Sequence, residues 1–295
     1  MKRVLLFFTL ITIIFAPRSF CQKLEYGKVY VPTSKMSADE IMMIMYHNKY
    51  SLFAQDYKLP DCQILYVDKS GFTRKRLAER LRIIKGGQDD IAYKDLISVT
   101  YPTAVKGLAI LTWTYQDSKK SQDTWLWIPS LKKVRKISAS SNDDAFMGSD
   151  FTVEEVSTRG FDDETYKLIG EENFKGYTFE HTGELKFEGK PCFVIECIPV
   201  KPHWYYSKRI VWVDKDTGGV IFEEYLDRKE KLFKTIFREW GRYDPKGKNY
   251  PQQSALECKD LRTGHKTVII NDNEEYDTGI SEQNFTVKAL MRSRW

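Results

Sequence analysis

Short strand-like segments alternate with turn signals about every 10 to 13 residues, and this spacing constrains the fold more than any other feature of the chain. Clear turns fall at 188–190, 217–219 and 227–229. Strands joined in this way predict an antiparallel meander, and no linker or change of composition divides it. We therefore expect one mainly β domain (α+β) built on a large curved sheet. The expected strands cover residues 63–68, 72–84, 108–115, 123–128, 133–138, 176–187, 192–200, 209–214, 220–226, 231–240, 253–261 and 265–271.

Helical signals are few. Ser37, followed three residues later by Glu40, forms a capping box and predicts a helix that runs to about His47. Four methionines fall between residues 36 and 45, which is typical either of a helix packed on a core or of an adaptable cover over an apolar ligand. Residues 140–160 interrupt the strands with a helix-like piece at 152–157, and a short amphipathic segment at 283–291 closes the chain.

The first residues have the pattern of an export signal. Lys2 and Arg3 precede an apolar run over 4–16 that is too short to span a bilayer, and Pro17 ends it. Small residues at the −3 and −1 positions, Ser19 and Cys21, predict cleavage before residue 22. We therefore expect a signal peptide over 1–21 and a single domain over 22–295. Lipid attachment at Cys21 is the alternative, although Phe20 and Arg18 do not fit its usual pattern.

Charge excludes nucleic acid as a partner. The whole chain carries a formal net charge of +5, but removal of the leader leaves 43 basic against 41 acidic residues. Aromatic residues make up 14% of the chain, and most of them remain in this nearly neutral domain. Such a composition suits a curved sheet with an apolar interior better than a charge-driven binder.

Cysteines give no sign of a redox or zinc site. Cys62, Cys192, Cys197 and Cys258 lack a C-x-x-C pair, and a domain of this length needs no disulfide framework. Cys192 and Cys197 stand five residues apart in one expected strand, so they point to opposite faces and cannot bridge each other.

Two strands carry side chains that invite a functional interpretation. Residues 72–84 also fit a helix, through Leu77, Leu81 and Ile84, so periodicity alone does not settle their structure. Read as a strand, they place Arg74, Arg76, Arg80 and Arg82 on one face, which is typical of a solvated outer surface; a lipid headgroup or partner site is the alternative. On the expected strand 123–128, Trp125 and Trp127 share one face while Leu126 and Ile128 share the other. We expect one of these faces to meet neighbouring elements and the other to line an interior.

No catalytic pattern emerges from the sequence. The nucleophile elbow G-x-S-x-G and the zinc motif H-E-x-x-H are both absent, and the four histidines are scattered. Acidic clusters at 89–90, 143–144, 154–155 and 162–164 lack calcium-loop spacing, so we interpret them as solvated turns. We therefore expect no enzyme activity, no metal and no cofactor.

One block points to a known family. Residues 127–137 (WIPSLKKVRKI), followed by Phe146-Met147-Gly148-Ser149-Asp150-Phe151-Thr152, resemble a motif of bacterial outer-membrane lipoprotein-sorting proteins of the LolA-like/LolB-like superfamily. Weaker similarities extend over 102–107, 212–217 and 284–290. The family's Tyr-x-Asp after the block is replaced here by Val153-Glu154-Glu155, which keeps the acidity and loses the aromatic ring.

The resemblance implies an incomplete antiparallel β-barrel of about eleven strands, with short helices covering its open concave side. It also implies a periplasmic carrier or chaperone that binds lipoprotein acyl chains or other lipid for transport toward the outer membrane, with an inner-membrane transporter as a further partner. The alternative is an envelope interaction module that docks on a transporter or partner without lipid cargo. The expected lining of the cavity and its lid is Met42, Met43, Met45, Trp113, Trp125, Trp127, Phe146, Met147, Phe151 and Trp212.

Overall fold

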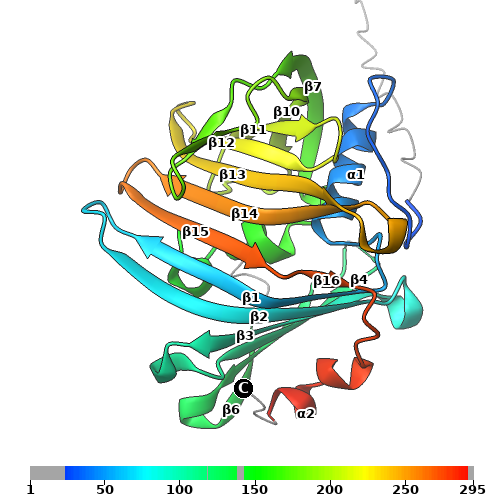
Figure 1. Ribbon diagram of the computed structural model, residues 1–295, viewed down its shortest axis with the longest axis vertical. Helices are drawn as coiled ribbons and strands as arrows, with labels where there is room; N and C mark the ends of the chain where they lie inside the picture. The colour runs from blue at the N-terminus through cyan, green and yellow to red at the C-terminus, as the bar shows by residue number, and fades with distance from the viewer. Residues whose placement is uncertain (1–23, 118, 138–142, 292–295) are drawn as a thin grey trace, which may run out of the picture.

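One antiparallel sheet of 14 strands makes up most of the computed structural model (Figure 1), which describes residues 24–117, 119–137 and 143–291. The predicted leader, residues 1–21, lies outside these ranges. The sheet is strongly curved and does not close, so its concave face forms an incomplete barrel. The expected fold class is confirmed, with more strands than the eleven implied by the family resemblance.

The described residues form two α-helices and 16 strands. Their bounds are α1 Ala38–Lys49, β1 Asp56–Val67, β2 Thr73–Ile84, β3 Ile91–Tyr101, β4 Ala109–Tyr115, β5 Asp123–Ile128, β6 Lys133–Ile137, β7 Glu164–Asn173, β8 Tyr177–Phe179, β9 Glu184–Lys186, β10 Pro191–Pro199, β11 Lys208–Asp214, β12 Val220–Leu226, β13 Leu232–Tyr243, β14 Tyr250–Asp260, β15 His265–Asp272, β16 Glu275–Tyr276 and α2 Val287–Leu290.

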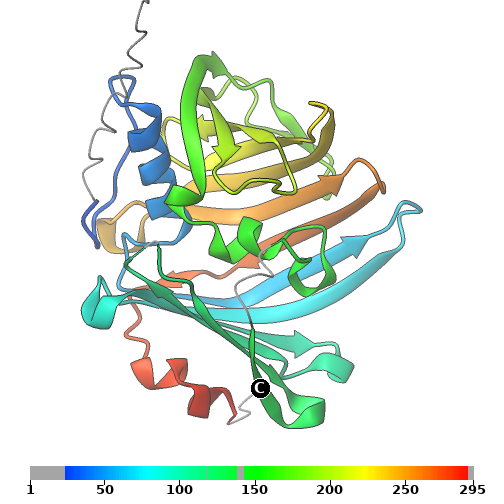
Figure 2. The same cartoon turned by 180° about the vertical axis from the view of Figure 1, so that it is seen from behind.

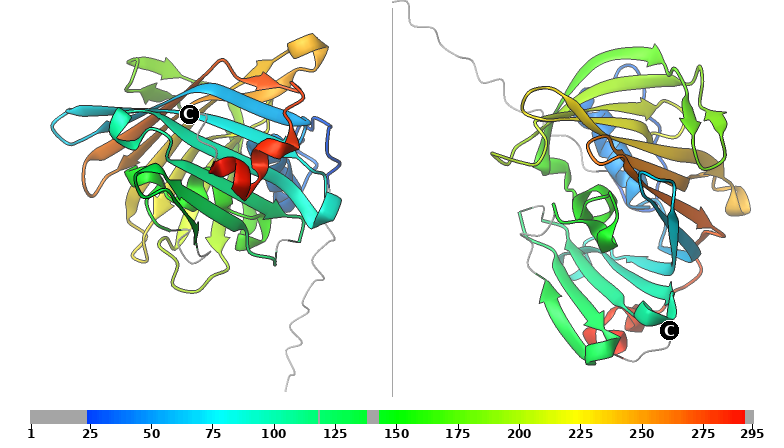
Figure 3. Two further views of the ribbon diagram at one scale, coloured as in Figure 1. Left: turned by 90° about the horizontal axis from the view of Figure 1, so that it is seen from below. Right: turned by 90° about the vertical axis from the view of Figure 1, so that its left-hand side faces the viewer.

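The order of the strands explains the position of the mid-chain segment. The sheet runs β6-β5-β4-β3-β2-β1-β15-β14-β13-β12-β11-β10-β7, with β16 paired to β1. Strands β6 and β7 are consecutive in sequence but lie at opposite ends of the sheet. Their connection must therefore cross the open side of the barrel. Figure 2 and the right-hand view of Figure 3 show residues 143–163, here called the insertion, lying between the two halves of the curved sheet.

Helix α1 covers the concave face at the β7 end. The predicted capping box is present: Ser37 Oγ accepts from the Glu40 amide, and the Glu40 carboxylate accepts from the Ser37 amide at 2.7 Å. The buried side of the helix packs on apolar side chains of β10 and β11, among them Phe193 and Val211. This cluster fills the concave side of that half of the sheet.

Two smaller elements cover parts of the convex face. Helix α2 and the preceding 3₁₀ turn, Glu282–Phe285, pack on β4 and β5. The separate two-stranded hairpin β8–β9 covers β11 to β14 around an aromatic cluster. The sheet is therefore sandwiched on both sides over much of its area, which explains why many of its strands are apolar on both faces.

The structure corrects three expectations about individual strands. Residues 176–187 form the short hairpin β8–β9 rather than one strand of the main sheet. Strands β3 and β7 were not predicted from the sequence, because charged residues interrupt their apolar alternation. Two of those charges, Asp95 on β3 and Glu164 on β7, are neutralised by arginines, as described below.

Candidate functional site

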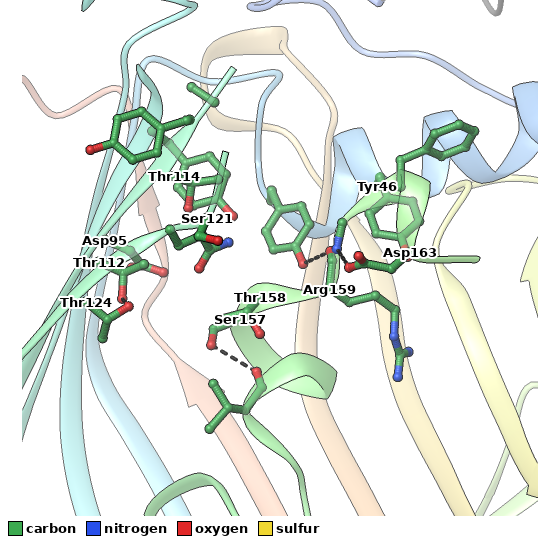
Figure 4. A pocket seen from close by; sticks show the side chains of 18 of the residues that line it. Tyr46, Asp95, Thr112, Thr114, Ser121, Thr124, Ser157, Thr158, Arg159 and Asp163 are labelled. Atoms are coloured by element: carbon green, nitrogen blue, oxygen red, sulfur yellow. Dashed lines mark hydrogen bonds between the residues drawn. The ribbon is translucent and has the colours of Figure 1, made fainter. Parts of the chain in front are cut away.

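A cavity of about 710 Å³ lies between the two halves of the barrel. One wall is the concave face of β3, β4 and β5. The other consists of α1, the insertion, and the segment around Leu24 and Tyr26. Figure 4 shows Asp95, Thr112 and Thr124 on the strand wall, with Ser157, Thr158 and Asp163 on the side of the insertion.

One part of the cavity wall is apolar. Ile97 comes from β3, Ile110 from β4 and Leu126 from β5, and Leu108 precedes β4. The apolar side chains that the insertion contributes include Phe146, Met147 and Val153. Aliphatic side chains on a sheet facing an aromatic ring and a methionine suit an irregular apolar ligand.

The end of the cavity formed by the β4–β5 turn is polar. Gln116, Asp117, Lys119, Ser121 and Gln122 contribute to its wall. The Tyr26 hydroxyl donates to Gln116 Oε1 at 2.8 Å and links this turn to the N-terminal segment. The Thr112 and Thr124 hydroxyl oxygens lie 3.4 Å apart on the strand wall between the two ends. The cavity therefore has the polarity of a site for an amphipathic molecule.

A buried charge cluster supports the strand wall. Asp95 on β3 accepts from the guanidinium groups of Arg80 at 2.5 Å and Arg82 at 2.7 Å. The two arginines hold the pKa of Asp95 down to about 2, although burial alone would raise it. The expectation that the arginine row faces solvent is wrong for Arg80 and Arg82, because β2 directs them to the concave side, where Asp95 neutralises them.

Buried charges hold the insertion against the β7–β13 half, with one ion pair inside the insertion and one to β13. Glu154 accepts from Arg159 at 2.5 Å, and Glu155 lies 3.1 Å from the Lys234 ammonium of β13. The Tyr205 hydroxyl lies 3.0 Å from Glu154 and 3.1 Å from Glu155. All of these charged groups are buried. The interpretation of 154–155 as a solvated turn is therefore wrong.

A second set of buried ion pairs involves Glu223 of β12 and Glu164 of β7. Glu223 on β12 accepts from Arg209 and Arg238, each at 2.7 Å, and Glu164 accepts from Arg209 at 2.6 Å. The arginines lower the pKa values of Glu164 and Glu223 despite their burial. The 162–164 cluster was also expected to be solvated, but Glu164 is 1% exposed. Residues that close this half of the barrel are thus charged but mutually paired.

The motif at 146–152 fixes the insertion to the centre of the sheet. Met147 has φ +50°, and its carbonyl oxygen accepts from Arg76 Nη1 at 2.9 Å and from the Tyr66 hydroxyl at 3.2 Å. The Asp150 carboxylate accepts from the Thr267 hydroxyl at 2.7 Å. Phe151 is completely buried. Hydrogen bonds from this block therefore join the insertion to β1, β2 and β15.

Comparisons with known proteins agree with this architecture. Residues 92–292 match the model of a family described as "Uncharacterized protein". A DUF1329 family protein from Desulfovibrio piger is 26% identical, with a TM-score of 0.71 over 86% of this chain and 97% of its own. An outer membrane lipoprotein-sorting protein domain from Vibrio parahaemolyticus is 24% identical, with a TM-score of 0.67 over 80% of this chain and 92% of its own.

A LolA superfamily protein from Nitrosomonas europaea shares the fold at 15% identity, with a TM-score of 0.60 over 86% of this chain and 99% of its own. The chain belongs to the matched family and has the LolA-like fold. The resemblance to outer-membrane lipoprotein-sorting proteins is confirmed. No curated protein matches the sequence.

Within this LolA-like fold, three of the expected lining residues reach the cavity: Met43, Phe146 and Met147. Met42 and Met45 are instead buried in the core under α1, where they pack with β10 and β11. Phe151 is buried in a second core cluster beneath the insertion. Helix α1 therefore places Met43 in the cavity wall, while Met42 and Met45 pack the helix onto the sheet.

The tryptophans lie on the other side of the sheet. Trp113, Trp125 and Trp127 point to the convex face, where they pack with Phe285 and Leu290 of the C-terminal segment. The Trp113 indole donates to the Phe285 carbonyl oxygen at 3.0 Å. Their expected place in the cavity is corrected, because strand alternation gives the cavity to Thr112, Thr124 and Leu126.

Trp212 is also on the convex face. It packs with Phe174 and Phe222 beside the β8–β9 hairpin, and its indole donates to Glu172 at 2.6 Å. Strand β11 uses its alternate residues, Val211 and Val213, to contact α1 on the concave side. The expected role of Trp212 in the lining is therefore corrected for the same reason as that of the other tryptophans.

Several cavity residues were missed from the sequence. Tyr46 of α1 stacks on Tyr50, the residue that caps the helix, and Tyr50 stacks on Tyr93 of β3. The Tyr50 hydroxyl donates to the Arg159 carbonyl oxygen at 2.7 Å. Burial raises the pKa values of all three tyrosines, so they stay neutral. The alternation in residues 108–115 placed Leu108 and Ile110 on the same face of a strand, but it did not show that this face was the concave one.

Reactive groups are sparse in the described part of the chain. Its residues contain no cluster of three or more histidine, cysteine, aspartate or glutamate side chains suited to a metal ion. The four cysteines are free thiols, and burial raises the pKa values of Cys62 and Cys192 to about 12. Cys192 and Cys197 lie on opposite faces of β10, as predicted. Among the described residues, no helix has both the length and the apolar character needed to cross a membrane.

Proposed function

We propose that this protein is a periplasmic carrier that holds an acyl chain, or another apolar ligand with a polar end, in the cavity between its two half-sheets. The observation that supports this proposal is the cavity itself, which has apolar side chains over one part of its wall and polar side chains at the β4–β5 turn.

The size of the cavity favours a single small ligand. Its volume of about 710 Å³ lies within the roughly 300–1,000 Å³ typical of sites that enclose one drug-sized molecule. Each methylene moved out of water contributes about 0.8 kcal/mol, so one partly buried acyl chain supplies enough free energy for retention and still permits release.

The relatives support an envelope location. The protein from Vibrio parahaemolyticus is described as an outer membrane lipoprotein-sorting protein domain, and this chain shares its fold. The export signal predicted for residues 1–21 is consistent with delivery to the same compartment. A carrier of this kind needs a donor and an acceptor, and a membrane transporter is a suitable class for the donor.

The test begins with the protein produced with its leader in an export-competent bacterial host. The purified exported form is analysed for bound lipid by mass spectrometry, then delipidated and titrated with a fluorescent fatty acid. We expect co-purified lipid and saturable binding. The absence of both results would exclude the carrier function.

A cavity-filling variant locates the site. Leu126→Trp adds an indole to the apolar wall and should weaken fatty-acid binding by roughly tenfold or more. Leu185→Trp, on the exposed surface of β9, is the matched control and should bind as the wild type does. Equal binding by Leu126→Trp and the wild type would place the ligand elsewhere.

The alternative is an interaction module without cargo, and one observation favours it. The β7–β13 half of the barrel is filled by α1 and by the paired charges around Glu223, so only part of the concave face lines the cavity. This function predicts that the exported protein carries no lipid and captures a partner through its surface. The lipid analysis above separates the two hypotheses.

A further inference from the structure

Three hairpin turns lie level with one another at one end of the sheet. The register shows this: Val67 pairs with both Thr73 and Lys266, and Asp260 pairs with both His265 and Lys234. The β1–β2, β14–β15 and β12–β13 turns therefore lie side by side. All three project toward the left-hand side of Figure 1.

The tip of the β1–β2 hairpin has no paired strand on the β2 side. Tyr101 at the end of β3 pairs with Leu77, so residues 73–76 of β2 extend beyond β3 and pair only with β1. The turn from 68 to 72 therefore protrudes from the body of the protein.

Two large apolar side chains stand exposed on these turns. Phe72 is 64% exposed and Leu261 is 51% exposed. The two turns approach each other, because a Cβ placed on Gly264 would meet Lys69 Cβ at 3.4 Å. An exposed phenylalanine and leucine on neighbouring protruding turns indicate a contact surface.

Basic residues surround the two apolar side chains. The residues 68–75, 227–231 and 260–264 include seven lysines and arginines against four acidic residues. We define the tip surface by the exposed apolar and basic residues of these turns, which are Lys69, Phe72, Arg74, Lys75, Arg228, Lys229, Lys231, Leu261 and Arg262.

The acidic residues of these turns hold the backbone in place. Asp68 accepts from the amides of Ser70 and Phe72, at 2.8 and 3.1 Å. Asp227 accepts from the amides of Lys229 and Lys231 in the same way. Asp260 accepts from the amide and the guanidinium of Arg262, whereas the fourth acidic residue, Glu230, is exposed and pairs with Lys208. Three of the four carboxylates are therefore engaged within their own turns, and basic side chains outnumber acidic ones on the outer side.

We propose that the tip surface docks the protein onto an anionic membrane surface, with Phe72 and Leu261 entering the interfacial region and the basic side chains contacting lipid phosphates. Apolar side chains inside a cationic rim match the chemistry of such a surface. An acidic protein would satisfy the charges but offers no reason for two protruding apolar side chains. This docking is independent of the cargo proposed above.

Vesicle co-sedimentation of the purified exported protein tests the proposal. We expect binding to vesicles of phosphatidylethanolamine and phosphatidylglycerol, weaker binding in high salt, and little binding to vesicles of phosphatidylcholine alone. Absence of binding to the anionic vesicles, or equal binding to both kinds, would overturn the proposal.

Variants assign the binding to the tip surface. The double variant Phe72→Ser/Leu261→Ser should bind anionic vesicles at least roughly tenfold more weakly. Its control is Val31→Ser/Ile169→Ser, which removes two apolar side chains that are 45% and 48% exposed elsewhere. Lys69→Glu/Lys229→Glu reports the electrostatic part separately and leaves the apolar side chains in place.

Two readouts distinguish docking from other effects. Fatty-acid titration of the same variants should be unchanged, so a failure of membrane docking and a failure of the carrier function give different results. Size-exclusion chromatography should show the same oligomeric state for the wild type and the Phe72→Ser/Leu261→Ser variant. A dimer lost only in that variant would assign the surface to a second copy of the chain and overturn membrane docking.

Discussion

Glu274 shows how burial acts on a single carboxyl group. It is 4% exposed and accepts from the hydroxyls of Tyr57 at 3.1 Å and Tyr276 at 3.0 Å. Burial raises its pKa to about 7, and these hydrogen bonds together with the nearby Arg80 only partly oppose the shift. The folded protein therefore holds this proton more tightly than the unfolded chain does.

The sign of the resulting pH dependence follows from linkage. As the pH rises from about 4.5 to 7, the unfolded chain loses this proton first, so Glu274 should lower the stability of the fold by roughly 2–4 kcal/mol. Glu274→Gln should abolish that decline and be the more stable form at pH 8. Urea unfolding across this range measures the effect, and parallel pH profiles for the two proteins would contradict it.

Asp95 illustrates the opposite case, a carboxylate kept charged by its partners. Asp95→Asn leaves Arg80 and Arg82 without their counter-ion on the concave face and should cost roughly 3 kcal/mol in the free energy of unfolding. Asp123→Asn, which removes a more exposed pair with Lys136, is the control and should cost less than about 1 kcal/mol. Equal losses in chemical denaturation would refute this ranking.

The elements differ in how far the sequence predicts them. Helix α1 follows from local chemistry, since Ser37 and Glu40 cap it within four residues. Strand β3 could not be found in the same way, because Asp95 interrupts its apolar pattern and is neutralised by arginines of β2. Strand β7 could not be found either, because its residues 169–173 are exposed and leave only a short apolar alternation. The alternation of β5 was clear, but which of its faces is concave depends on α2, which packs behind Trp125 and Trp127.

The C-terminal segment is expected to be an essential cover for those tryptophans. Phe285 is completely buried against Leu111 and Trp127, so Phe285→Ala should lower stability by about 3–5 kcal/mol and shift tryptophan fluorescence to the red. Leu131→Ala, at a 51% exposed position on the β5–β6 turn, should change stability by less than about 0.5 kcal/mol. Unaltered fluorescence in Phe285→Ala would show that the segment does not shield the indoles.

The whole molecule joins a filled half and a hollow half. Helix α1 and paired charges occupy the concave side of β7 to β13, while the cavity lies against β3 to β5. The spacing of turns in the sequence predicted the curved sheet, and the resemblance of the 146–152 block to a known motif implied helices across its open side. It did not lead to the unequal filling, since that depends on ion pairs such as Glu155 with Lys234.

Occupation of the cavity should stabilise the entire fold. A ligand that binds only the folded state adds about 2.7 kcal/mol at a concentration one hundred times its Kd. The delipidated protein should therefore melt several degrees lower than the fatty-acid-saturated one, and Leu126→Trp should reduce that difference. Identical melting temperatures with and without ligand would argue against binding in the cavity.

The pairing of β1 with β15 has a consequence for how this protein acquires its shape. A chain that emerges from its N-terminus can form β1 to β6 as one meander and β7 to β15 as another. Within the sheet, the two are joined along the seam from Asp61 with Asp272 to Val67 with Lys266. Contacts so distant in sequence form late. The strand wall of the cavity and helix α1, which packs on β10 and β11, are therefore fixed opposite each other only after the last long strand is available, so ligand uptake should follow completion of the chain.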